Sequence, residues 1–118
     1  MKWSVFRMLL DLHDNVSGYE LNVKVGDNYR LIYATISDGG EPYELDDNMT
    51  ASMIIRTSSS TATATCIIGK GMISAQIPNT ILANAGTYEC EFQMSSGSGV
   101  GLKKVTTPSF RIVVNPTV

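Results

Sequence analysis

Apolar and polar residues alternate along most of this chain, and the clearest run lies in its last third. From Tyr88 to Met94 every second residue is apolar, and the residues between them carry acidic or amide side chains. A period of two is typical of a strand with one face in a core and the other in water. The same pattern predicts strands over Glu20–Val25, Tyr29–Ser37, Thr50–Thr57, Cys66–Ile68, Met72–Ile77 and Val105–Val114.

Two segments give no clear period. Trp3–Leu12 alternates imperfectly and fits either a strand or a short amphipathic helix. Residues 58–65 are almost pure Ser, Thr and Ala, which fits an exposed strand or a loose sheet edge.

Turn residues separate the predicted strands. Pro78 ends one strand, Asn79 or Thr80 can cap a short helical turn near residues 80–85, and Gly86 supplies the left-handed residue that closes it. Asp38-Gly39-Gly40 is a strong hairpin signal. The residues assigned to structural turns are Gly26, Asp27, Asp38, Gly39, Gly40, Pro42, Gly86 and Pro108.

Together these elements predict an all-β fold. We expect an immunoglobulin-like β-sandwich of seven to eight antiparallel strands with one short helical turn, because turns recur about every ten residues. Residues 1–118 form a single domain, alone or as the N-terminal part of a longer protein, since this length suits one core.

Composition narrows the choice of partners. The net charge is −2 and Lys and Arg form no run, which predicts neither nucleic acid nor an anionic membrane as partner. The apolar run near the N-terminus lacks the form of a signal peptide, and no stretch is long enough to span a bilayer. Cys66 and Cys90 fit no metal or redox spacing, so both are expected to be reduced.

Few residues suggest chemistry. His13 is the only histidine and lies in a polar turn with Asp11 and Asp14, and no serine of the chain sits in a nucleophile-elbow context. Asp46-Asp47 sits in a turn, and Glu89 and Glu91 lie on the water side of their strand. Glycines 97, 99 and 101 precede no helix, so they indicate a hairpin tip instead of a phosphate loop. We therefore predict no catalytic, metal-binding or cofactor-binding residue.

The core does not account for one row of apolar side chains, which we call the stripe. If Ile32, Ala34 and Ile36 face inward, then Tyr29, Leu31 and Tyr33 face outward. Either the N-terminal segment covers them, for instance through Trp3, Val5 or Phe6, or they form a protein–protein interface.

The order of several motifs resembles the N-terminal domain of phage baseplate upper proteins, over residues 9–115. Each motif alone is ordinary strand and turn sequence. The motifs are Gly26-Asp27, Ile32-x-Ala34-x-Ile36-x-Asp38-Gly39-Gly40-x-Pro42-Tyr43-x-Leu45, Ile81-Leu82-Ala83-x-Ala85-Gly86-Thr87 and Thr107-Pro108-Ser109-Phe110-x-Ile112-Val113-Val114.

The resemblance implies a non-catalytic virion module. In that family the domain is an immunoglobulin-like sandwich that docks on the tail-tip ring, while the rest of the chain forms a trimeric stalk toward receptor-binding proteins. It therefore implies other phage tail or baseplate proteins as partners and no cofactor. One departure concerns the turn after residues 51–56, where a Lys-Pro-Asp-Gly-like sequence is replaced by Thr57-Ser58-Ser59-Ser60.

Two other function classes stay open. Gly86-Thr87-Tyr88-Glu89-Cys90 echoes the tyrosine corner of immunoglobulin domains, which suggests a binding or adhesion module for carbohydrate or protein. The partner cysteine and the tryptophan of true immunoglobulin domains are missing from the expected strands. An enzyme is the third class, but the sequence offers no convincing acid–base pair.

Overall fold

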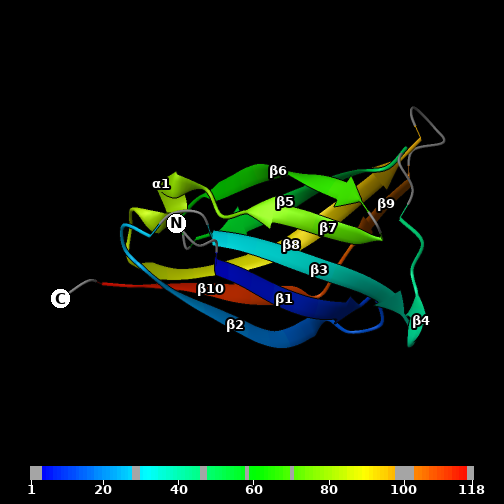
Figure 1. Cartoon of the computed structure of the whole chain (residues 1–118), viewed down its shortest axis with the longest axis horizontal. Helices are drawn as coiled ribbons and strands as arrows, with labels where there is room; N and C mark the ends of the chain where they lie inside the picture. Colours follow the sequence, from blue (N-terminus) through cyan, green and yellow to red (C-terminus); the bar gives the residue numbers. More distant parts are fainter. Residues whose placement is uncertain are drawn as a thin grey trace.

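A computed structural model describes residues 4–27, 30–45, 48–57, 59–69, 71–97 and 103–116. In this part of the chain, strands form nearly all of the regular structure, with one short helix (Figure 1). In chain order the elements are β1 (Ser4–Asp11), β2 (Val16–Lys24), β3 (Arg30–Asp38), β4 (Glu41–Pro42), β5 (Thr50–Arg56), β6 (Thr61–Gly69), β7 (Met72–Gln76), α1 (Asn79–Leu82), β8 (Gly86–Ser96), β9 (Lys103–Thr106) and β10 (Ser109–Asn115).

The strands form two layers that share β6. Hydrogen-bonded neighbours run in the order β1-β3-β7-β6-β5-β8-β10-β2, with β4 beside β3 and β9 beside β8. The first part of β6 pairs with β5 as far as Cys66, and its last part, from Ile67, pairs with β7. One sheet therefore folds over on itself, and its two edge strands, β1 and β2, come back side by side (Figure 1).

Pairing directions differ in part from expectation. The all-β sandwich is confirmed, but the structure has ten strands in its described part, and β1 pairs with β3 and β10 with β2 in parallel. The predicted seven to eight antiparallel strands did not include these two parallel pairings, because alternation fixes which face a residue takes and carries no information on strand direction. Immunoglobulin-like topology stays a prediction.

Both segments without a clear period are strands. β1 buries Met8 and Leu10, so the N-terminal segment is not a helix. Most of β6 is an exposed strand, and it is not a loose edge because it joins the two layers. The hairpin from β5 to β6 forms without the Pro-Asp-Gly turn, since the Thr57 hydroxyl accepts hydrogen bonds from the N–H groups of Ser59 and Ser60. Ser58 lies outside the described residues.

The core lies between the layers and follows the predicted alternation. Ile32, Ala34 and Ile36 are fully enclosed, and the Phe92 and Phe110 rings pack at 5.3 Å between centroids. Each such aromatic contributes about 1.5–3 kcal/mol through burial. The other members whose side chains are almost wholly buried include Leu10, Met53, Ile55, Ile73, Ile77, Leu82, Met94 and Ile112.

The short helix is capped differently from the prediction. It begins after Pro78 without any side-chain cap, and Ala83, in right-handed helical conformation, ends it. Caps from Asn79 or Thr80 and a helix stop at Gly86 were therefore wrong. Gly86 is instead the first residue of β8, where its φ of +155° starts the strand opposite Val114.

The other turn glycines occupy tight connections. Gly39 and Gly40 alone join β3 to β4, at φ values of +62° and +88°, which glycine adopts without strain. The Gly26 N–H donates to the Leu82 carbonyl, and the Asp27 carboxylate receives the Lys24 N–H. Pro42 lies in β4, and Pro108 is buried in the connection from β9 to β10.

Candidate protein–protein interface

The outward side chains of β1, β3 and β7 form a surface that we call the apolar face. It comprises Val5, Arg7 and Leu9 from β1, Leu31, Tyr33 and Thr35 from β3, and Met72, Ser74 and Gln76 from β7. Val5 is 38% exposed and Leu9 55% exposed, so β1 presents two large apolar side chains to the outside on the same side of the strand. Tyr29, the first residue of the predicted stripe, lies outside the described residues.

Strand register sets the order of side chains across this face. Arg7 lies opposite Tyr33, and Tyr33 lies opposite Ser74 on its other side. Ile67 of β6 is opposite Ser74 in turn and is 72% exposed. The row thus crosses four strands, and the predicted pair of Leu31 and Tyr33 is the centre of a wider surface.

Covering of the stripe by the N-terminal segment stays a prediction in part, because Trp3 lies outside the described residues, but Val5 and Phe6 do not lie over it. β1 lies beside β3 in the same layer, so Val5 is a lateral neighbour of Leu31, and Phe6 points to the core side. The contact over Tyr33 comes from Arg7, whose guanidinium carbon lies 5.2 Å from the ring centroid. A cation over an aromatic ring at this distance is attractive.

Arg7 differs from the other three arginines of the chain. Each of the others forms an ion pair with a carboxylate: Arg30 with Asp27, Arg56 with Glu91, and Arg111 with Glu89. Within the described ranges, Arg7 has an aromatic contact and no carboxylate. It is also the single charged side chain among those assigned above to the apolar face.

A hollow of about 250 Å³ opens beside Arg7. It is lined by Arg7, Met8, Leu9, Tyr19, Tyr33, Thr35 and Met72. Tyr19 reaches it from β2: its hydroxyl accepts a hydrogen bond from the Leu9 N–H at 3.1 Å. Sequence analysis did not single out Tyr19, because only the fold brings β2 next to β1.

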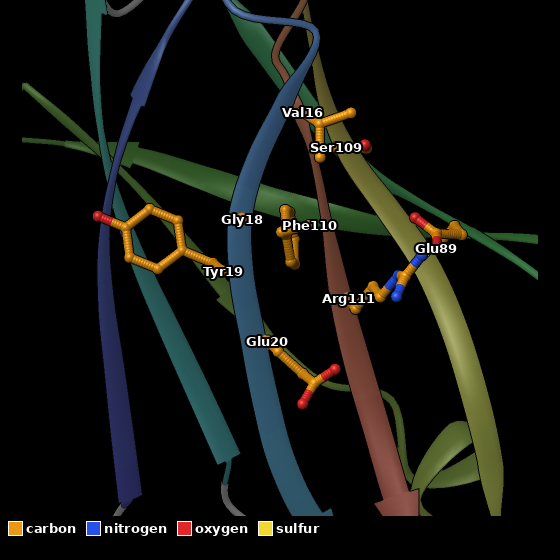
Figure 2. A pocket seen from close by; sticks show the side chains of 8 residues that line it. All are labelled: Val16, Gly18, Tyr19, Glu20, Glu89, Ser109, Phe110 and Arg111. Atoms are coloured by element: carbon orange, nitrogen blue, oxygen red, sulfur yellow. Dashed lines mark hydrogen bonds and ion pairs between the residues drawn. The ribbon is translucent and has the colours of Figure 1, made fainter.

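A bulge explains the position of Tyr19. The pairing of β2 with β10 shifts register between Ser109 and Arg111, and Gly18 at this point has a φ of +82°. Bulges of this kind redirect side chains. In Figure 2, the Tyr19 ring points away from β10 and toward β1.

The same bulge leaves a second hollow, of about 280 Å³, between β2 and β10 (Figure 2). Phe110 and Ser109 line it on one side, and Val16 lies at its rim with 69% of its surface exposed. Its charged groups already satisfy one another in part, since Arg111 Nε donates to Glu89 at 2.6 Å. With Arg111 and Glu89 paired, the remaining charged group of this hollow is the carboxylate of Glu20, so the hollow does not suit an anionic ligand, in contrast to the one beside Arg7.

The opposite outer face of the sandwich is polar. Glu89 and Glu91 lie there, as their strand pattern predicted, and each pairs with an arginine. The two outer faces therefore differ: one carries several charged residues, two of whose glutamates pair with arginines, and the other is mostly apolar with Arg7 as its charged side chain. Such asymmetry favours the apolar face as a contact surface.

Asp11 closes one end of the apolar face. Its carboxylate accepts hydrogen bonds from the Ser37 hydroxyl and from the N–H groups of His13, Gly39 and Gly40, at 2.8–3.0 Å. These bonds, led by that of His13, hold the pKa of Asp11 well below its usual range. Asp11 thereby fixes the turn between β3 and β4, a role that its position at the end of an apolar run did not reveal.

The other chemistry-bearing residues do not converge. His13 Nε2 lies 3.0 Å from Asp38 on an exposed turn. Within the described part of the chain, no three His, Cys, Asp or Glu side chains gather as a metal site, and no helix has the length and apolar character to cross a membrane. Asp46 and Asp47, and glycines 99 and 101, lie outside the described residues.

Both cysteines are free and buried. Burial raises the pKa of Cys66 and of Cys90 to about 12, so each thiol stays protonated at neutral pH. The expectation of two reduced cysteines is confirmed, and neither belongs to a reactive site.

By its fold the described part of the chain is a small all-β sandwich. Comparison with known families is more specific: the chain matches the BppU N-terminal domain over residues 6–118, and it belongs to this family of phage baseplate proteins. No curated protein matches the sequence. Among solved structures, the fold is similar to the "N-terminal domain of phage TP901-1 ORF48", with a TM-score of 0.73 and 13% identity over 95% of this chain and 98% of that one.

Proposed function

We propose that this domain is a non-catalytic attachment module of a phage or prophage baseplate. It docks on the tail-tip assembly through the apolar face and connects that assembly to receptor-binding components. The supporting observation is the exposure of Val5 and Leu9 near Tyr33 on one outer face, while the other outer face is rich in charged residues.

The full protein is proposed to act in the virion as a homo-oligomer, in the form of a trimer. Membership of the family supports this assembly, because the family's stalks are trimeric by the resemblance described above. In this arrangement the domain contributes contact surface, and its partners are other tail or baseplate proteins.

The docking experiment mixes the purified chain with the tail-tip proteins of the same phage and measures complex mass by light scattering after size exclusion. Leu9→Ser removes an exposed apolar side chain from the apolar face and should weaken binding at least several-fold. Val16→Ser is the matched control, because Val16 is 69% exposed but lies on β2 beside the other hollow. Equal binding by both variants and the unaltered chain would exclude the apolar face as the docking surface.

Tyr33→Glu provides a second test of the same face. A carboxylate in place of the ring removes the aromatic contact with Arg7 and places a negative charge on the docking face, between Arg7 and Ser74. We expect loss of complex formation with the fold intact by circular dichroism. Reproducible binding to a glycan array without binding to tail proteins would instead support the adhesion-module alternative.

A further inference from the structure

The hollow beside Arg7 presents hydrogen-bond donors without an acidic side chain. Arg7 carries a guanidinium, and Thr35 and Tyr33 carry hydroxyl groups. The Tyr19 hydroxyl accepts the Leu9 N–H, which leaves its own proton available to a ligand. The walls contributed by Leu9 and Met72 are apolar.

Donors with apolar walls suit an anionic group on an apolar support. A guanidinium binds a carboxylate through two parallel N–H bonds, and the other three arginines of the chain each contact a carboxylate. Arg7 is held over the Tyr33 ring, which restricts its rotamers before any partner arrives. A preorganised donor loses less entropy on binding.

We propose that this hollow binds an Asp or Glu side chain of the docking partner, with Arg7 as its ionic contact. The inference rests on the proposed function, since it names the chemistry of the partner at the same face. Charge complementarity selects the occupant: the nine side chains of the apolar face include one cation and no anion, and the Asp11 carboxylate at its end is already occupied by four hydrogen bonds, so the partner supplies the carboxylate. A second copy of the chain would need an acid on the same face to pair with Arg7.

A first experiment tests the site without the partner. Glutarate, a dicarboxylate with the end group of glutamate, is titrated into the ¹⁵N-labelled chain, and the arginine Nε–Hε and backbone N–H signals are followed by NMR. We expect saturable millimolar shifts at Arg7 and Leu9 and none at Arg111, which already pairs with Glu89. Equal shifts at Arg7 and Arg111, or none at Arg7, would overturn the proposal.

A second experiment uses the tail-tip protein that binds the chain. Arg7→Gln should raise the dissociation constant of the complex tenfold or more. A loss of affinity of this order is expected when one member of a desolvated charge pair is removed. Arg7→Lys should give an intermediate loss, because lysine keeps the charge but not the bidentate geometry. Arg111→Gln is the matched control and should change binding less than about twofold, as exposed ion pairs contribute little.

The two proposals fail in different ways. If Leu9→Ser weakens binding and Arg7→Gln does not, docking on the apolar face stands and the carboxylate site is wrong. If neither variant changes binding, the proposed docking face is wrong, and a glutarate result still decides whether the hollow binds carboxylates. A charge swap would identify the paired residue: if the Arg7→Glu variant does not bind, replacing the paired Asp or Glu of the partner by Lys should restore binding.

Discussion

The Tyr88 hydroxyl in β8 donates a hydrogen bond to the Asn84 backbone carbonyl at 2.9 Å. Only 6% of Tyr88 is exposed, so the bond lies at the edge of the core, where it ties the end of the α1 turn to the start of β8. This is the tyrosine-corner contact that the sequence around Tyr88 suggested.

Tyr88→Phe should therefore lower the free energy of unfolding by about 1–2 kcal/mol, since the substitution removes a buried hydrogen bond and leaves the Asn84 carbonyl without it. Urea denaturation measures the change. Tyr33→Phe is the control, because its hydroxyl lies on an outer face, and it should leave the midpoint nearly unchanged. An equal loss in both variants would contradict a specific role for the corner.

Asp11 predicts a dependence of stability on pH. Folding lowers the pKa of its carboxyl through hydrogen bonds from His13, Gly40, Gly39 and Ser37. The folded state thus releases this proton more readily than the unfolded chain, so stability is present above the usual pKa of about 3.9 and is lost as the pH falls toward the lowered value.

We therefore expect Asp11→Asn to lower the midpoint of urea unfolding at neutral pH, and the difference from the unaltered chain to shrink as the pH falls below about 4. Asp14→Asn serves as the control and should follow the unaltered chain at every pH. A constant difference across the acidic range would show that the charge of Asp11 is unimportant.

Substitution of Gly40 should lower stability through the backbone conformation alone. A side chain there would meet no atom within 4 Å, but its φ of +88° is unfavourable for any residue with a Cβ. Gly40→Ala should cost about 1–2 kcal/mol, and Gly40→Asn less, because asparagine tolerates this conformation better. Gly69→Ala is the matched control, since its added Cβ also meets open space and its φ is not positive. Thermal unfolding gives both values.

We expect the two cysteines to react differently in the folded and in the unfolded chain. Because burial raises the pKa of both thiols to about 12, neither Cys66 nor Cys90 should react with a disulfide reagent near neutral pH. Both should react once denaturant unfolds the chain. Rapid reaction of one thiol in the folded protein would show that its strand opens locally.

Much of the fold could be predicted because strand faces are set locally. Alternation from Tyr88 to Met94 predicted the buried positions of β8, and the Gly39-Gly40 pair predicted a hairpin, as the structure shows. The candidate interface could be predicted from the sequence only in part. Leu31 and Tyr33 were assigned to the outer face, but Arg7 and Tyr19 were not linked to them.

The sequence alone determined which side chains face the core and where the chain turns, because both depend on near neighbours along the backbone. The tertiary structure decided which strands pair and in which direction, including the parallel pairs of β1 with β3 and β10 with β2. It also decided that Arg7 lies over Tyr33 and that Tyr19 reaches Leu9. Those contacts join residues far apart in the chain, and a local pattern contains no information about which distant strand closes the sheet.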